Sequence, residues 1–315
     1  MKKLVVSSSP HIRSESSTRR IMLDVIIALL PVAVMGAVIF GIRALAVLSV
    51  TVAFSVFSEA IFNLLTKKEQ TVDDLSAIVT GLILGLNLKA DAPLWQCAIG
   101  AIFAIVVVKC LFGGLGCNFA NPAITARVFL LVSFAGALGG GSVPKISRAP
   151  ELVSGATPLV VLESGDELPS LLDMFLGLRG GAIGESCILA LIIGFAYLVV
   201  RKVINFEIPL IFVGTVFALT LIFENSFSVA LYGIMAGGLI FGAVFMATDY
   251  VTTPITRSGK MVFAFGCGLI TFLIRRFGSY PEGVSFSILF MNVLSPYIEK
   301  WTAKKPLGVG GAKNG

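Results

Sequence analysis

The chain has 315 residues, of which 13% are charged, and its mean hydropathy is +0.95. A soluble domain carries about 25% charged residues, so this composition requires lipid as the solvent and excludes a soluble enzyme. The formal net charge is +6. The basic residues are strung between apolar stretches without interleaved aromatic residues, which excludes a nucleic-acid-binding surface. The sequence therefore predicts an all-α integral membrane protein that contacts membrane lipid.

Ten apolar stretches approach the length of about 20 residues that a helix needs to cross a bilayer. We expect about ten transmembrane helices, at roughly 21–41, 44–65, 75–89, 93–112, 119–138, 185–202, 207–224, 229–247, 260–277 and 284–301. The third stretch is short and contains Gly81, Gly85 and Asn87, and the eighth contains three glycines between 237 and 242. Both are therefore expected to be interrupted, as in helices with which transporters line a site near the bilayer midplane.

The distribution of basic residues predicts the orientation in the membrane. If the N-terminus is cytoplasmic, 17 of the 24 Lys and Arg residues fall on the cytoplasmic side and 7 on the other side. Positive charge accumulates on the cytoplasmic side of membrane proteins. We therefore expect a multi-pass protein of the cell (inner, cytoplasmic) membrane with residues 1–20 and the tail 303–315 in the cytoplasm. Arg275 and Arg276 run against this rule.

Two short similarities indicate an internal repeat. Gly81–Gly85 resembles Gly238–Gly242, and Lys109–Gly113 resembles Arg275–Gly278. We predict two five-helix repeats, 21–138 and 185–302. Because each repeat has an odd number of spans, the two repeats insert into the membrane in opposite senses. Chance similarity between glycine-rich apolar stretches is the alternative. The connection 139–184 would then be extracytoplasmic.

The connection contains the string Ser154-Gly155-Ala156-Thr157, followed by Pro158. Glycine and alanine leave room for a bulky group near the backbone, and Thr157 supplies a hydroxyl that a phosphate can esterify. Proline fixes the backbone that follows. On composition alone the string indicates a turn.

The same string resembles the [ST]GAT motif of the NqrB/RnfD family, in which FMN is joined through its phosphate to the threonine. Other stretches resemble family motifs in the family's order, at residues 8–11, 28–31, 113–123, 245–252 and 280–286. Two departures occur, because Ala120 alters the usual spacing and Tyr250 replaces a proline. Within the family, the absence of a long N-terminal extension favours the D subunit of Rnf complexes over the B subunit of quinone reductases.

This resemblance implies a membrane subunit of a complex that moves electrons between reduced ferredoxin and NAD⁺ and couples this transfer to Na⁺ or H⁺ translocation. It implies covalent FMN on Thr157, within the motif formed with Ser154, Gly155 and Ala156. It also suggests a second, noncovalent flavin such as riboflavin within the helix bundle, whose position the sequence does not determine and for which Thr248 and Asp249 are candidate neighbours.

The resemblance further implies other membrane and peripheral Rnf subunits as partners, including a flavin-bearing extracytoplasmic subunit. The chain has no nicotinamide-binding fingerprint, and its five cysteines have no iron–sulfur or metal-ligand spacing. We therefore expect one redox station of a translocase, with no catalytic residue, no metal site and no complete active site of its own.

Ionisable residues inside apolar stretches are costly and are candidates for function. Glu59 lies among Phe57 and Ile61, so it belongs either to an ion path or to a buried pair with a cation. Asp24 is a second candidate, although the start of a helix favours an acid for electrostatic reasons alone. Asn121 could coordinate Na⁺ or cap a helix.

Two other functions fit parts of the sequence. One is a B-type subunit of a Na⁺-translocating NADH:quinone reductase. The other is a urea-channel-like solute transporter without a redox role, which a five-plus-five inverted repeat would suit. The loop with Thr157 discriminates against the transporter, because a passive channel has no evident use for it.

Overall fold

The computed structural model describes residues 17–135, 141–144, 170–278 and 283–303. In these ranges the chain is helical, and its only β pairing is an isolated bridge between Ser142 and Gly181. The prediction of an all-α membrane protein is confirmed at this level. Both terminal segments and most of the connection 139–184 lie outside the described residues.

The first part of the chain forms five helical segments and one short 3-10 turn. They are α1 (Thr18–Phe40), α2 (Ile42–Leu65), η1 (Val72–Asp74), α3 (Ser76–Asn87), α4 (Leu94–Ile102), which continues as the π-helix η2 (Phe103–Cys110), and α5 (Pro122–Ser133). The Ser17 hydroxyl caps α1 by accepting from the backbone N–H of Arg20. Gly41 adopts φ 77°, which separates α1 from α2.

The second part forms a corresponding series of helices. They are α8 (Leu171–Leu176), α9 (Ile188–Val200), α10 (Glu207–Glu224), α11 (Phe227–Met235), α12 (Leu239–Phe241), which continues as the π-helix η4 (Gly242–Met246), α13 (Arg257–Phe277) and α14 (Val284–Thr302). Ser226 caps α11 and Thr256 caps α13 through their hydroxyls.

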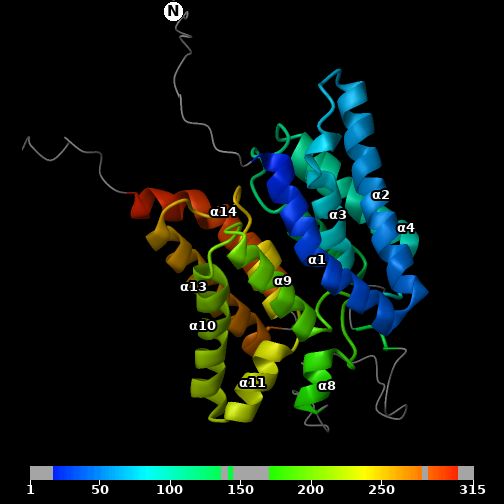
Figure 1. The fold of residues 1–315 in the computed structure, drawn as a ribbon. Helices are drawn as coiled ribbons and strands as arrows, with labels where there is room; N and C mark the ends of the chain where they lie inside the picture. Colours follow the sequence, from blue (N-terminus) through cyan, green and yellow to red (C-terminus); the bar gives the residue numbers. More distant parts are fainter. Residues whose placement is uncertain (1–16, 136–140, 145–169, 279–282, 304–315) are drawn as a thin grey trace, which may run out of the picture.

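The two series form two groups that lie side by side in Figure 1, with α1 to α4 in one group and α10 to α14 in the other. Helices α1 and α9 join them along one face. A Cβ at Gly194 would lie 2.5 Å from the backbone oxygen of Ala28, so this close approach requires glycine on α9. Helices α8 and α11 lie at the end of the bundle opposite to the start of α1.

The number of membrane crossings is only partly supported by helix length. Four described helices are long and apolar enough to cross a bilayer, namely α1, α2, α10 and α13. A fifth crossing arises if α11 and residues 239–246, bent by 60° at their break, form one span. Each of the ten predicted stretches contains a helix, but the predicted count of ten crossings is not confirmed. The predicted interruption of the eighth stretch is confirmed.

The predicted interruption of the third stretch is wrong, because α3 is continuous through Gly81 and Gly85 and ends at Asn87. These glycines let α3 approach α2 closely. A Cβ at Gly81 would lie 2.7 Å from the Cα of Val52, and one at Gly85 would lie 2.5 Å from the hydroxyl of Thr51. Their role in this helix is packing.

Two of the 17 basic residues assigned to the cytoplasmic side, Lys109 and Arg127, are buried inside the protein. Lys109 is 2% exposed and Arg127 is 4% exposed. Their positions are set by internal contacts and carry no information on orientation. The predicted orientation therefore rests on the remaining lysines and arginines.

Candidate functional site

A cavity of about 100 Å³ lies where the two groups of helices meet. It receives residues from both groups, including Val25 and Lys109 from the first and Leu198 and Phe245 from the second. Each π-helix contributes to its wall, η2 through Lys109 and η4 through Val244 and Phe245. Because π-helical turns occur frequently at functional sites, this cavity is the leading candidate for a site.

The cavity wall is mostly apolar and carries a few polar groups. Apolar side chains of Val25, Leu198 and Ile204 face polar ones of Asn118 and Asp249. An apolar pocket with a small number of fixed polar groups is typical of a site for a small organic molecule or cofactor.

The loop between η4 and α13 closes one side of this cavity and contains Thr248 and Asp249, the two residues predicted to lie near a second flavin. The Asp249 carboxylate accepts hydrogen bonds from the backbone N–H of Val251 at 3.3 Å and the hydroxyl of Thr252 at 3.2 Å. Asp249 is partly exposed, but its carboxyl lies among protein atoms. This burial raises the pKa of the carboxyl above its ordinary value, and the two hydrogen bonds oppose the rise. The structure therefore brings both predicted residues to one wall.

Lys109 connects the cavity to a buried ion pair. Its Nζ lies 2.8 Å from Oε1 of Glu59 and 2.6 Å from Oγ of Ser76. Both charged residues are almost completely buried, Glu59 being 1% exposed. The prediction that Glu59 could pair with a buried cation is confirmed, and the cation is Lys109.

Hydroxyl and carboxyl groups extend this pair toward the turn after α2. The Thr71 hydroxyl donates to the same Oε1 of Glu59 at 2.6 Å, and Asn63 donates to Thr71 at 3.0 Å. Ser76 also donates to the carboxylate of Asp74 in η1. Oε2 of Glu59 has no hydrogen-bond partner among the described residues. The network thus runs from the cavity to the loop that joins α2 and α3.

Asp24 fastens the two groups of helices together beside the cavity. Its carboxylate on α1 accepts from the Tyr197 hydroxyl at 2.9 Å and from Arg201 Nη2 at 3.2 Å, both at the end of α9. Asp24 is 7% exposed and lies beyond the first turn of α1, which contains no acid, so a helix-start effect alone does not explain its position. Three charged or polar groups share this contact, and it stabilises the α1–α9 boundary.

Asn121 acts as a helix cap. Its side-chain oxygen accepts from the backbone N–H groups of Ala123 and Ile124, and its amide lies 3.5 Å from the backbone oxygen of Met246. The amide contact reaches η4 across the boundary between the two groups. Asn121 also lines the cavity. The same residue therefore caps α5 and forms part of the candidate site.

A second polar region lies at the opposite end of the bundle, around the break between α11 and α12. Arg275 on α13 donates to the backbone oxygens of Gly233 at 2.6 Å and Ala236 at 3.3 Å. These are carbonyls at the C-terminal end of α11. Buried Glu185 and Arg179 lie in the segment before α9, where Arg179 donates to the backbone oxygen of Glu185 at 2.8 Å.

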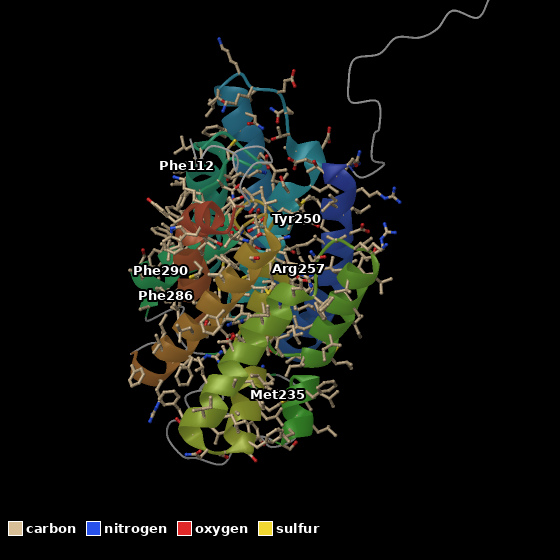
Figure 2. All side chains as sticks on the ribbon, turned by 90° about the vertical axis from the view of Figure 1, so that its left-hand side faces the viewer. Phe112, Met235, Tyr250, Arg257, Phe286 and Phe290 are labelled. Atoms are coloured by element: carbon tan, nitrogen blue, oxygen red, sulfur yellow. The ribbon has the colours of Figure 1, made fainter. Side chains whose placement is uncertain are left out.

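Figure 2 shows that the two polar regions are separated along the bundle, since Tyr250 and Arg257 lie near its middle and Met235, the last residue of α11, lies near one end. The four residues of the predicted attachment motif, Ser154, Gly155, Ala156 and Thr157, lie outside the described residues.

Sequence reasoning did not identify Lys109, Tyr197, Arg201 or Arg179 as site residues. For Lys109 a signal exists, because it stands between Val108 and Cys110 in an apolar stretch and a lone lysine there requires a partner. For Tyr197 and Arg201 no local signal exists, since their partner Asp24 lies more than 170 positions earlier in the chain.

Comparison with known proteins gives a consistent result across the chain. The sequence model of the NQR2, RnfD, RnfE family matches residues 5–308. The D subunit of the Na(+)-translocating ferredoxin:NAD(+) oxidoreductase complex of Acetobacterium woodii is 46% identical over 310 residues, which cover 97% of this chain and 96% of that protein.

Two further relatives carry related names. The D subunit of the proton-translocating ferredoxin:NAD(+) oxidoreductase complex of Clostridium ljungdahlii is 41% identical, with 96% of each chain covered. The D subunit of the ion-translocating oxidoreductase complex of Stutzerimonas stutzeri is 38% identical, with 90% of each chain covered.

Proposed function

Because the chain belongs to the NQR2, RnfD, RnfE family, we propose that it is the D-type membrane subunit of an ion-translocating ferredoxin:NAD⁺ oxidoreductase complex. The observation that carries this proposal is the 46% identity, over nearly the whole of both chains, to a protein named as that subunit. Two relatives are named for different ions, Na⁺ and the proton, so the proposal covers either ion.

The proposed arrangement in the membrane has ten spans in two inverted repeats, 21–138 and 185–302, with both termini in the cytoplasm. It is supported by a helix in each of the ten stretches. The short helix α3 is almost completely buried among its neighbours, as short or broken segments that line an internal site are. The connection 139–184 is extracytoplasmic in this arrangement.

The proposed covalent cofactor is FMN, esterified through its phosphate to the Thr157 hydroxyl. Bound there, FMN would supply the capacity to accept and donate electrons singly or in pairs. The chain's own contribution is a tether in the connection that leads into α8, which lies with α11 at one end of the bundle.

The proposed second, noncovalent flavin, such as riboflavin, would lie in the cavity between the two groups of helices. The wall fits such a group, because Val25, Leu198 and Phe245 offer apolar contact and Asn118 and Thr248 offer polar contact. The cavity of about 100 Å³ is smaller than the roughly 300 Å³ at which ligand sites begin. Binding therefore requires the cavity to widen.

The proposed ion path includes Glu59, with Asp24 and Asn121 lining or bordering the same region. Glu59 lies between the cavity, through Lys109 and Ser76, and the α2–α3 loop, through Thr71. A continuous run of hydroxyl and carboxyl groups can pass a proton or coordinate a partly dehydrated cation. The positive charge of Lys109 would oppose a second cation beside it unless Glu59 compensates.

The proposed partners are the other membrane and peripheral subunits of the complex, including a flavin-bearing extracytoplasmic subunit, in the cell membrane. Many apolar side chains face outward, among them Phe112 and Phe290, which lie along one outer edge in Figure 2. Such a surface is suited to lipid and to the helices of neighbouring subunits.

The attachment of FMN can be tested with Thr157→Ala in the full complex. We expect this variant to lose in-gel flavin fluorescence from the denatured subunit, because no other residue of the motif is proposed to carry the ester. Ser164→Ala removes a hydroxyl from the same connection outside the motif and should keep the fluorescence. Undiminished fluorescence in Thr157→Ala would contradict the assignment.

A further inference from the structure

A second cavity, of about 140 Å³, is lined in part by the 247–256 loop. Its wall is built from the turn between α9 and α10, the first turn of α10, the loop itself and the first turn of α13. The lining residues are Lys202, Val203, Ile204, Asn205, Ile208, Thr248, Tyr250, Thr253 and Lys260. It shares four of these residues with the first cavity, namely Val203, Ile204, Thr248 and Tyr250, so the two cavities adjoin.

The charge of this cavity is positive and uncompensated by described residues. Lys202 and Lys260 line it, and neither forms an ion pair within the part of the chain that the structure describes. The neighbouring carboxylate of Glu207 is already paired with Arg257 at 2.6 Å. Asp249 is hydrogen bonded to Val251 and Thr252 and lines the other cavity.

The position of Lys260 strengthens this imbalance. It lies in the first turn of α13, a helix of 21 residues. The N-terminal end of a helix carries a partial positive charge, so a cation there is unfavourable unless an anion is nearby. A bound anion would relieve the repulsion between the helix end and the lysine, and it would be attracted by both.

The polar groups of the wall determine which donors are free for an anion. The hydroxyls of Thr248 and Thr253 donate to the backbone oxygens of Val244 and Asp249, both at 2.6 Å. The Tyr250 hydroxyl donates to the backbone oxygen of Val203. The two ammonium groups and the amide of Asn205 are therefore the donors that remain.

We propose that this cavity binds a phosphate group, held by Lys202 and Lys260 with Asn205 as a third donor. A volume of about 140 Å³ is several times the roughly 30 Å³ that one water occupies in the liquid, which is room for a phosphate and its remaining water. Phosphate accepts charge-assisted hydrogen bonds from several donors at once. The group is either the headgroup of an anionic membrane lipid or free phosphate, because the cavity lies at the ends of apolar helices α9 and α13.

The test compares two double variants that remove the same charge. Lys202→Asn with Lys260→Gln removes both lysines of the cavity, and asparagine suits the left-handed backbone of residue 202, where φ is 57°. Lys67→Asn with Lys68→Gln is the matched control. Residue 67 has φ 54° at the end of α2, and neither lysine lines either cavity.

Each full-length protein is placed in lipid nanodiscs containing equal amounts of phosphatidylglycerol and phosphatidylcholine, and lipids retained on release are counted by native mass spectrometry. A second arm titrates the protein in phosphatidylcholine nanodiscs with inorganic phosphate, followed by thermal unfolding. Loss of two charge-assisted contacts should weaken retention of phosphatidylglycerol, or stabilisation by phosphate, at least about tenfold in the cavity variant. The control should stay within about twofold of the unaltered protein in the same arms.

An effect confined to phosphatidylglycerol identifies a lipid headgroup, and one confined to inorganic phosphate identifies the free anion. Equal losses in the two double variants would show that only general charge attraction acts and would overturn the proposal. The same holds if the cavity variant binds both probes as well as the unaltered protein. Lys260→Arg keeps the charge and should retain binding, which separates loss of the site from loss of the fold.

Discussion

The two glycine-rich segments that resemble one another in sequence have different structures. Gly81–Gly85 lies inside the continuous helix α3, whereas Gly238–Gly242 follows a break and starts α12 and η4. In α3 the glycines face α2 at distances that exclude a Cβ. In the other half Gly237 adopts φ 66°, and Arg275 binds the carbonyls that the break leaves free.

This comparison teaches that glycine content alone does not determine where a membrane helix breaks. A break leaves backbone carbonyls without partners, and in an apolar environment these must be satisfied by other groups. In the second half, Arg275 donates hydrogen bonds to these carbonyls. In the first half the corresponding basic residue, Lys109, instead binds the Ser76 hydroxyl at the start of α3 and the carboxylate of Glu59.

The largest effect is expected from breaking the buried pair of the first half. Glu59→Gln leaves the Lys109 ammonium buried without its counter-charge, which should lower the free energy of unfolding by about 3–5 kcal/mol. Lys109→Met should cost a similar amount, and the double variant should recover most of the loss because neither charge remains. Unfolding of the purified protein by SDS in mixed micelles measures this series.

The same series separates stability from ion translocation. If Glu59 belongs to the ion path, the double variant will regain stability and still fail to translocate ions in vesicles carrying the whole complex. Full translocation by the double variant would assign Glu59 a purely structural role.

The next effect concerns the break in the second half. Arg275→Met removes two charge-assisted hydrogen bonds to the end of α11, and we expect a loss of about 1.5–3 kcal/mol. Arg276→Met is the matched control, because its contact with Glu224 at 3.5 Å is partly exposed and should contribute less than about 1 kcal/mol. Hydrogen exchange of the amides at 233–238 should rise only in the Arg275 variant. Equal exchange in both variants would contradict the proposed role of Arg275.

A smaller difference is expected between matched glycine substitutions. Gly81→Ala places a Cβ 2.7 Å from the Cα of Val52, so it should destabilise the protein by about 1–3 kcal/mol. Gly238→Ala places a Cβ 3.3 Å from the carboxylate of Glu185, a milder approach than the one at Gly81, and should change stability by less than about 1 kcal/mol. The two thermal unfolding midpoints test this order, and a larger loss in the Gly238 variant would reverse our comparison.

The smallest effect is a pH dependence at the loop beside the cavity. Burial raises the pKa of Asp249 above its ordinary value of 3.8. The folded state therefore holds the carboxyl proton more tightly than the unfolded state does. The resulting contribution to the free energy of unfolding is complete below pH 3.8 and is lost as the pH rises through the folded pKa. Asp249→Asn should abolish this loss. The stability of the variant relative to the unaltered protein should therefore increase as the pH rises from about 4 through the folded pKa of Asp249, as thermal midpoints can show. A constant difference across this range would argue against the raised pKa.

The sequence was sufficient for the features that depend on local pattern. Apolar runs predicted a helix in each of ten places, and the glycines at 237 and 238 marked the break before η4. Glu59 was identified because an acid among Phe57 and Ile61 needs a partner.

Features that depend on distant residues could not be predicted in this way. The continuity of α3 follows from its contact with Thr51 and Val52 on α2. The contact of Asp24 with α9 depends on Arg201, which lies 177 positions later in the chain. The cavity itself exists only after the two groups of helices meet, so Lys109 and Leu198 acquire a common role through tertiary structure alone.

The central claim is that this chain is a flavin-bearing redox subunit, and mass spectrometry of the peptide that contains Thr157 tests it most directly. Protein purified from the intact complex is digested, and the peptide is fragmented to locate any added mass. We predict an addition equal to FMN minus one water, as a phosphoester bond requires, located on Thr157. An unmodified Thr157 peptide as the only form recovered from active complex would contradict the account.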